Sequence, residues 1–162
     1  MQLIEVGYCV VLLVVANGAP VIAADLLKER WKWPLDAGHA FFDGQPWFGY
    51  SKTWRGIIVA MVAASLAAAL LGIGWQIGMA FAALAMVGDL LASFTKRRMG
   101  IVVSGRAWFL DQLPESMLPT FLLSHSLDLS SLEASIAVGI FTLLDLIGSP
   151  ILYLLHLRKR PY

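Results

Sequence analysis

The chain has 162 residues, of which 59% are hydrophobic and only 14% are charged, and its mean hydropathy is +0.74. Soluble domains are less apolar than this, so the composition predicts an integral membrane protein. Lys and Arg number 12 against 11 Asp and Glu, and a net charge of +1 excludes the basic excess typical of nucleic-acid binding. The single cysteine, Cys9, excludes an internal disulfide and a cysteine-based metal motif.

The first predicted helix covers residues 3–24, an apolar stretch that is long enough to cross about 30 Å of hydrocarbon. Glu5, Asn17 and Pro20 interrupt it. Asn17 and Pro20 are compatible either with a break that exposes polar backbone inside the membrane or with a plain proline kink.

A charge-free run follows at residues 56–88, and as one helix it would be about 50 Å long, too long for a single span. Gly72 and Gly74, next to Trp75, supply a turn near its middle. The run is therefore predicted to be a tight hairpin of two helices. Weaker signals predict a fourth span at residues 108–125 and a fifth at residues 133–157, with Asp145 in the middle of the fifth.

The distribution of basic residues supports five spans, because only a hairpin at residues 56–88 puts all of them on one side of the membrane. They are Lys28, Arg30, Lys32, Lys52, Arg55, Lys96, Arg97, Arg98, Arg106, Arg158, Lys159 and Arg160. By the positive-inside rule, the N-terminus is expected outside and the C-terminus in the cytoplasm. We therefore expect one all-α, polytopic domain over residues 1–162 in the cytoplasmic membrane, with cytoplasmic loops at about 25–56 and 92–110.

The end of the first loop places Lys52, Thr53 and Arg55 just before a predicted helix. Backbone N–H groups and the helix dipole favour an anion at such a position, and phosphate is the obvious candidate. The alternative is a juxtamembrane anchor in which Lys52 and Arg55 face lipid headgroups.

The second loop begins with Asp89, Ser93 and then Lys96 and Arg97, a spacing that puts all four on one helical face. Asp111 and Glu115, four residues apart, add two carboxylates on one side of the next helix. Carboxylates beside basic clusters suit phosphoryl chemistry, in which Mg²⁺ bridges phosphate oxygens while Lys and Arg neutralise charge. The alternative is that the basic residues only set the topology, with Asp89 paired to one of them.

At these residues the chain resembles the CDP-archaeol synthases, which are related to the phosphatidate cytidylyltransferases. The resemblance covers roughly residues 12–120 and is carried by an ordered set of motifs: ANGAP at 16–20, LDAG at 35–38, SKTWRG at 51–56, GDLLASFTKRR at 88–98 and DQ at 111–112. It departs from the archaeal pattern at Tyr50 and Ser51, where an acidic residue is expected, and from the phosphatidate enzymes at Gln112. These departures leave the choice between ether-linked and ester-linked lipid open.

The resemblance implies that CTP reacts with a lipid phosphomonoester to give a CDP-activated lipid and pyrophosphate. It implies that Asp89 and Asp111 hold Mg²⁺, with Glu115 as a helper. The other implied roles are phosphate binding by Lys52 and Arg55, contact with the triphosphate by Ser93, Lys96 and Arg97, and, for Asp36, orientation of the first loop or contact with the nucleotide.

Two other function classes stay open from the residues alone. A lipid kinase or CDP-alcohol phosphotransferase would use the same carboxylates and Mg²⁺, although the spaced aspartates of the latter are missing. A small transporter or scaffold is the non-enzymatic alternative, and the gathering of charge at one face argues against a pore. Small residues such as Ala63, Ala64 and Gly72 suit close helix contact, either in a homodimer or within one subunit.

Overall fold

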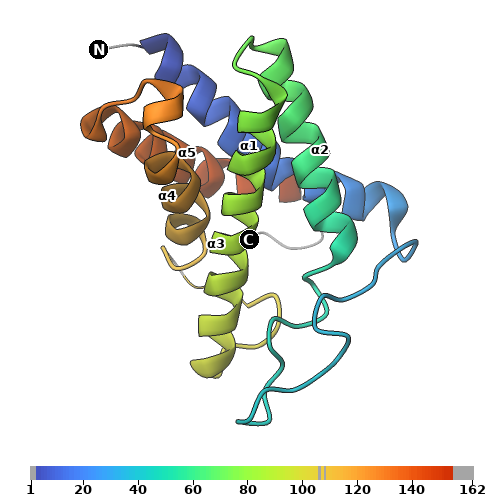
Figure 1. The fold of residues 1–162 in the computed structure, drawn as a ribbon. Helices are drawn as coiled ribbons and strands as arrows, with labels where there is room; N and C mark the ends of the chain where they lie inside the picture. The colour runs from blue at the N-terminus through green and yellow to red at the C-terminus, as the bar shows by residue number, and fades with distance from the viewer. Residues whose placement is uncertain (1–2, 106, 108, 155–162) are drawn as a thin grey trace.

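The computed structural model describes residues 3–105, 107 and 109–154, and over these it is helical, as predicted. Arg106 and the basic tail residues Arg158, Lys159 and Arg160 lie outside this part of the chain. The elements are α1 (Leu3–Leu27), α2 (Trp54–Leu70), α3 (Trp75–Arg98), α4 (Gln112–Leu122), the short 3₁₀ helix η1 (His125–Leu127) and α5 (Ser131–Leu154) (Figure 1).

Three of these helices are long and apolar enough to cross a membrane: α1, α3 and residues Ser131–Gly148 of α5. The apolar helix α2 is shorter, at 17 residues. α1 runs unbroken through Pro20, and the Asn17 side chain donates a 3.0 Å hydrogen bond to the carbonyl of Leu13 in its own helix. Of the two sequence alternatives for this helix, the break is therefore wrong.

The fourth predicted span is corrected by the structure. α4 has only 11 residues, so it rises about 16 Å, roughly half the hydrocarbon thickness. The predicted segment at residues 108–125 overstates it because the chain before Gln112 is a turn and the chain after Leu122 leads into η1. The fifth prediction is met by α5, whose described residues end at Leu154.

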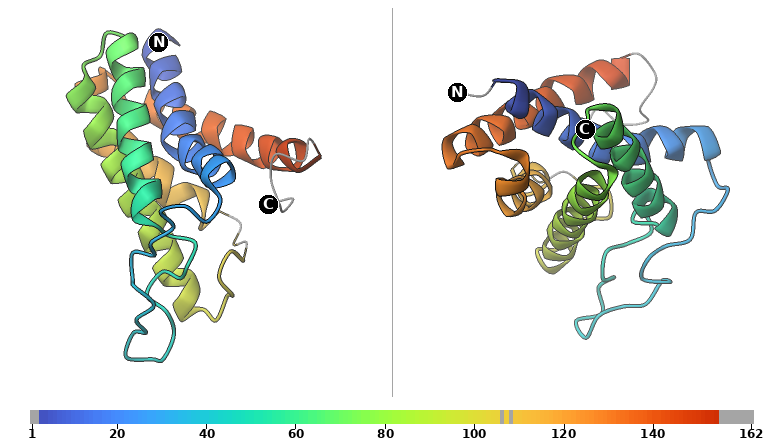
Figure 2. Two further views of the ribbon diagram at one scale, coloured as in Figure 1. Left: turned by 90° about the vertical axis from the view of Figure 1, so that its right-hand side faces the viewer. Right: turned by 45° about the horizontal axis from the view of Figure 1, so that its top comes forward.

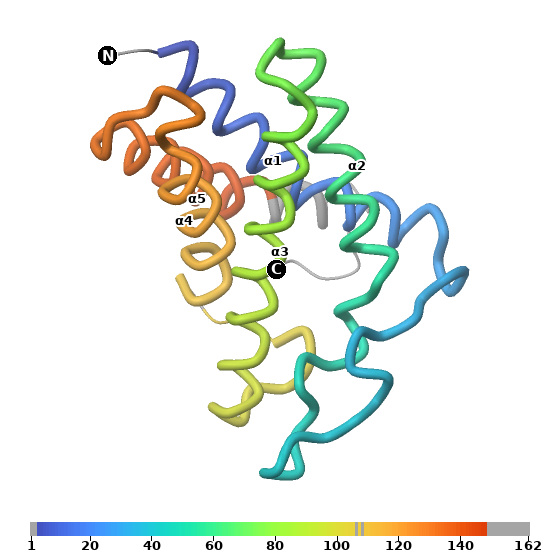
Figure 3. Tube along the Cα trace, viewed as in Figure 1, coloured from blue at the N-terminus to red at the C-terminus, as the bar shows by residue number. Residues whose placement is uncertain are grey.

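The hairpin prediction is confirmed. α2 ends at Leu70 and α3 begins at Trp75, and the turn between them uses the positive φ angles of Gly72 (76°) and Gly74 (98°). Figures 1 and 3 show this turn near the N-terminal end of α1, while the two loops that carry basic residues lie together at the opposite end. Because the two helices of the hairpin run in opposite directions, the chain returns to the end from which it started, and both loops lie at that end of the bundle.

Small residues bring the helices into backbone contact. A Cβ atom on Gly78 of α3 would lie 2.2 Å from the carbonyl oxygen of Ala64, and Ala60, Ala64 and Ala68 of α2 are fully buried. Ala64 is thus used for packing inside one subunit. Gly88 of α3 makes an equally close approach to α4, where a Cβ would lie 2.2 Å from the carbonyl oxygen of Pro114.

α3 extends further than the sequence indicated. It stays helical through Arg98, so the connection to α4 begins at Met99 rather than near residue 92. The last two turns of α3 therefore carry their side chains beside the two loops.

α5 contacts α1 and α4, and Figure 2 (left) shows it extending sideways, away from the α2–α3 hairpin.

Candidate active site

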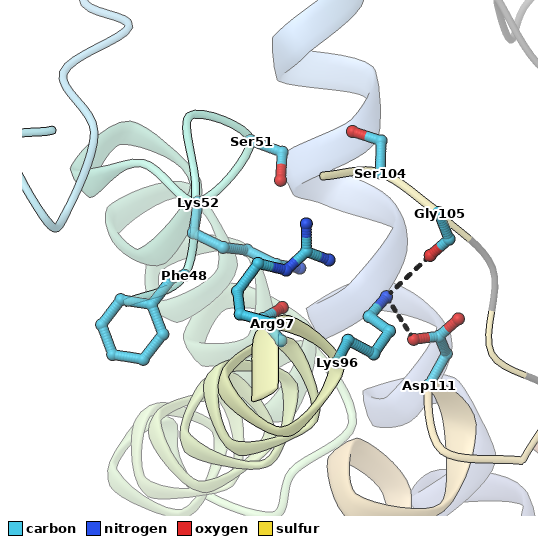
Figure 4. A pocket seen from close by; sticks show the side chains of 9 residues that line it. Phe48, Ser51, Lys52, Lys96, Arg97, Ser104, Gly105 and Asp111 are labelled. Atoms are coloured by element: carbon cyan, nitrogen blue, oxygen red, sulfur yellow. Dashed lines mark hydrogen bonds and ion pairs between the residues drawn. The ribbon is translucent and has the colours of Figure 1, made fainter. Parts of the chain in front are cut away.

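A cavity of about 210 Å³ lies where the C-terminal end of α3 meets the two loops (Figure 4). Three segments contribute its lining, and most of the side chains are polar or cationic. The lining residues are Phe48, Ser51 and Lys52 of the first loop, Ser93, Lys96 and Arg97 of α3, and Ser104, Gly105 and Asp111 of the connection to α4.

The helical spacing of Ser93, Lys96 and Arg97 explains why α3 supplies three of these residues. Positions three and four apart share one face of a helix, and all three side chains are buried on that face. Asp89 lies one turn earlier, and its carboxylate reaches Lys52, which itself lines the cavity. The shared face predicted from the sequence is confirmed.

Lys52 is held by a carboxylate from another helix. Its Nζ atom lies 2.6 Å from Oδ1 and 2.5 Å from Oδ2 of Asp89, and each side chain is about one quarter exposed. Because Lys52 belongs to the first loop and Asp89 to α3, this ion pair ties the two walls of the cavity together.

Lys96 makes a second pair of the same kind. Its Nζ atom lies 2.5 Å from Oδ1 of Asp111 and donates a 3.1 Å hydrogen bond to the carbonyl of Gly105, as Figure 4 shows. The other oxygen of Asp111 accepts a 2.9 Å hydrogen bond from the backbone N–H of Ala107. Asp111 thus orders the chain just before α4 and also holds an ammonium group at the cavity.

Arg97 is the one cavity cation with buried donor atoms left over among the described residues. Its side chain is 3% exposed, and Nε and Nη1 have no hydrogen-bond partner in the described part of the chain. A buried guanidinium with unused N–H groups is costly unless an acceptor is supplied. The planar donor fork matches the geometry of a phosphate.

Asp36 holds the first loop together by accepting hydrogen bonds from its backbone. Its carboxylate accepts hydrogen bonds from the backbone N–H groups of Gly38 (3.1 Å), Phe48 (3.2 Å) and Gly49 (2.8 Å). Burial acts to raise the pKa of this carboxyl, but the three backbone donors outweigh it, so the pKa lies below its ordinary value.

We expect the first loop to loosen in acid because of Asp36. A lowered pKa in the folded state means that the stabilisation is present above the unfolded-state pKa, about 3.9, and is lost as the pH falls through the lower folded value. Tryptophan fluorescence of the detergent-solubilised protein between pH 7 and pH 2 should show this transition, since Trp47 adjoins Phe48. Asp36→Asn should remove it, and identical titration curves for the two proteins would contradict the assignment.

Thr53 and Arg55 do not line the cavity. The Thr53 hydroxyl accepts a 3.2 Å hydrogen bond from the N–H of Gly56 and so caps α2. Arg55 is 8% exposed and donates from Nη1 to the carbonyls of Lys28 (3.0 Å) and Arg30 (2.6 Å), just beyond α1. Thr53 therefore starts α2, and Arg55 ties the first turn of α2 to the chain just beyond α1.

Comparison with known proteins places the chain in a family. Residues 7–162 match the family described as CarS-like, CDP-archaeol synthase. The chain belongs to the CDP-archaeol synthase family.

Individual relatives cover different shares of the chain. A CDP-archaeol synthase from Pyrobaculum arsenaticum is 30% identical over 154 residues, which is 91% of this chain and 92% of the relative. One from Staphylothermus marinus is 34% identical over 114 residues, 65% of this chain and 60% of that protein. A solved structure, described as an intramembrane enzyme for archaeal membrane lipids biosynthesis, has a TM-score of 0.74 at 28% identity, covering 87% of this chain and 90% of that one.

Two of the three carboxylates expected to hold a metal in this CDP-archaeol synthase family member, Asp89 and Asp111, are each paired with a lysine. Among the described residues, no three His, Cys, Asp or Glu side chains gather closely enough to form a metal-binding group. Glu115, the expected helper, is half-buried on α4. Mg²⁺ in proteins ordinarily binds one or two carboxylates together with water and substrate phosphates. Asp89 and Asp111 fit this pattern, and a cage of three carboxylates is not required.

Sequence reasoning missed several lining residues. Ser104 lies in the connection to α4 and has a positive φ of 61°, which no sequence signal indicates. Phe48 and Ser51 reach the cavity only because Asp36 folds the first loop back on itself. Of these residues only Ser51 carried a sequence signal, as a hydroxyl within the SKTWRG segment predicted to bind an anion.

Proposed function

We propose that this cavity is where the protein transfers CMP from CTP to the phosphate of an archaeal ether lipid, giving CDP-archaeol and pyrophosphate. The observation that carries the proposal is the gathering of Lys52, Lys96 and Arg97 from two segments around one cavity, with two buried Arg97 donors unused. Three cations in so small a space suit a polyphosphate better than any neutral ligand. Membership of the CDP-archaeol synthase family supports the lipid substrate.

The reaction needs positioning and charge stabilisation rather than a covalent intermediate. An oxygen of the lipid phosphate attacks the α-phosphorus of CTP, and the bond from that phosphorus to the pyrophosphate oxygen breaks. Arg97 would bind phosphate oxygens through Nε and Nη1, and Lys52 and Lys96 would neutralise the charge that builds up on the leaving pyrophosphate. The Ser93 hydroxyl, 2% exposed on the same helical face, would donate to a further phosphate oxygen.

We propose Asp89 and Asp111 as the residues that hold Mg²⁺. When bound, the ion would supply charge neutralisation to the phosphates. The two carboxylates now hold Lys52 and Lys96, so a change of partner would free both ammonium groups for phosphate.

The topology is also a proposal. The positive-inside rule puts the N-terminus outside and the cavity on the cytoplasmic side, where CTP is found. The apolar chains of the lipid would lie against the membrane-facing surface of the helices, so that only its phosphate enters the cavity. A homodimer stays a prediction.

The test uses purified protein in detergent with Mg²⁺, α-labelled CTP and a panel of lipid phosphomonoesters. The panel includes a geranylgeranyl ether lipid phosphate and phosphatidic acid. We expect label to enter the lipid phase with the ether lipid and more slowly with the ester. Transfer from γ-labelled ATP instead would indicate a kinase, and no transfer with no CTP binding by folded protein would refute the proposal.

A further inference from the structure

Arg98 follows the cavity residues Lys96 and Arg97 directly but turns to the first loop instead of the cavity. Its Nε atom lies 2.7 Å from Oδ2 of Asp43, and Nη2 donates a 2.7 Å hydrogen bond to the carbonyl of Pro46. The Arg98 side chain is 21% exposed, so this ion pair is partly shielded from solvent.

Aromatic rings surround the same guanidinium. Its central carbon lies 5.0 Å from the ring centre of Phe41 and 4.4 Å from that of Phe94, and the two rings are 5.3 Å apart, edge to face. Trp47 completes the cluster, at 4.8 Å from Phe41 and 5.9 Å from Phe94. Cation–π contacts of this kind add to the ion pair, and they favour Arg over Lys because the planar group stacks.

The part of the loop that Arg98 holds is a closed turn, residues 40–47. Ala40 bridges to Pro46, and the N–H of Phe41 donates a 2.7 Å hydrogen bond to the carbonyl of Gln45. These two contacts close the turn on itself. The residues that follow it are Phe48, Ser51 and Lys52, which form the loop wall of the cavity.

We propose that Arg98 is a positioning residue for nucleotide binding, and this rests on the proposed function. It fastens the 40–47 turn to the end of α3 and thereby sets the separation between the two walls of the cavity. The other contacts of the loop differ in kind. Asp36 binds only loop amides, the bridge between Pro34 and Thr53 closes the base of the loop near α1 and α2, and the Lys52–Asp89 pair holds one side chain rather than the 40–47 turn. Without Arg98, Lys52 would keep its pair with Asp89, but the loop backbone that carries Lys52 would no longer be held at a fixed distance from Lys96 and Arg97.

The kinetic test compares Arg98→Ala, Arg98→Lys and Asp43→Ala with the wild type. In Arg98→Ala we expect the KM for CTP to rise about tenfold, with kcat changed by less than about threefold and the KM for the lipid unchanged. Arg98→Lys should recover part of the loss, because it keeps the ion pair without the stacking. Adding Asp43→Ala to Arg98→Ala should raise the KM no further, since the two residues share one contact.

A matched control removes another ion pair of the same loop. Lys32 and Glu29 lie 3.0 Å apart on the surface, outside the cavity lining. The double variant Glu29→Ala/Lys32→Ala should leave the KM for CTP unchanged. If loss of any ion pair in the loop weakened CTP binding, the KM for CTP would rise in this control variant as well.

Hydrogen–deuterium exchange provides a readout that does not depend on turnover. In Arg98→Ala, peptides covering residues 40–47 should exchange faster than in the wild type, while α2 peptides are unchanged. Unchanged exchange in the turn, an unchanged KM for CTP, or an equal rise of the KM for CTP and the KM for the lipid would overturn the positioning role. Absence of CMP transfer in the wild type would refute the proposed function instead, and the exchange result would still decide whether Arg98 fastens the turn.

Discussion

Asp111→Asn is expected to lower the rate of CMP transfer on the order of a hundredfold to a thousandfold while leaving the protein folded. The amide keeps the size of the carboxylate and an oxygen for the Ala107 N–H, but it loses the charge that holds Lys96 and that would hold Mg²⁺. Initial rates with labelled CTP over a range of Mg²⁺ concentrations would measure the effect. A fall in apparent Mg²⁺ affinity should accompany the loss of rate.

The control for this substitution is Asp128→Asn. Asp128 is exposed next to η1, and its left-handed backbone (φ 52°) is one that Asn adopts readily. It removes one negative charge without touching the cavity, so the rate should stay within about twofold, as for surface substitutions generally. A normal rate in Asp111→Asn would remove Asp111 from the metal site.

Gly88→Ala is expected to cost both stability and activity, because α3 and α4 touch at this residue through their backbones. The added Cβ would lie 2.2 Å from the Pro114 carbonyl oxygen and 2.7 Å from Cα of Glu115, so α4 must move. Overpacking of this kind destabilises by about 1–3 kcal/mol. A moved α4 also carries Asp111 away from Lys96, so the activity per folded molecule should fall about tenfold or more.

Two other glycine substitutions separate these effects. Gly78→Ala makes a similar overlap with the Ala64 carbonyl but lies in the first turn of α3, far along the helix from the cavity. It should lower the thermal stability with little change in activity per folded molecule. Gly139→Ala in α5 meets nothing within 4 Å and should be neutral or slightly stabilising. Equal activities for the Gly88 and Gly78 variants would show that the α3–α4 approach does not position Asp111.

The parts of the molecule that were predictable are those governed by local spacing. A long charge-free run with glycines at its middle indicated the α2–α3 hairpin, and the 3.6-residue period indicated that Ser93, Lys96 and Arg97 share a face. Both patterns depend only on the helix repeat and on the exclusion of charge from hydrocarbon.

The parts that were not predictable depend on contacts between distant segments. Arg55 looked like a phosphate ligand because it precedes a helix, but carbonyls left open beyond α1 compete for its guanidinium. Likewise, nothing local indicates that Lys52 meets Asp89, 37 residues away, since that contact requires the whole first loop to fold over α3. The shortness of α4 was hidden because apolar residues at 107–110 precede its first turn.

The 11 residues of α4 have a consequence for the surrounding lipid. A helix of about 16 Å beside α3, which has 24 residues, leaves the bundle with unequal hydrophobic height around its circumference. Asp111 pairs with Lys96, and the buried Gln112 donates to Asp145 of α5, so the polar start of this short helix lies at the same depth as the cavity. A lipid lying along the exposed Leu113, Met117 and Phe121 of α4 would have its phosphate near the depth of the cavity while its chains stay in the hydrocarbon. Bilayer thickness then becomes a determinant of how readily the substrate reaches the enzyme, alongside the chemistry of its headgroup.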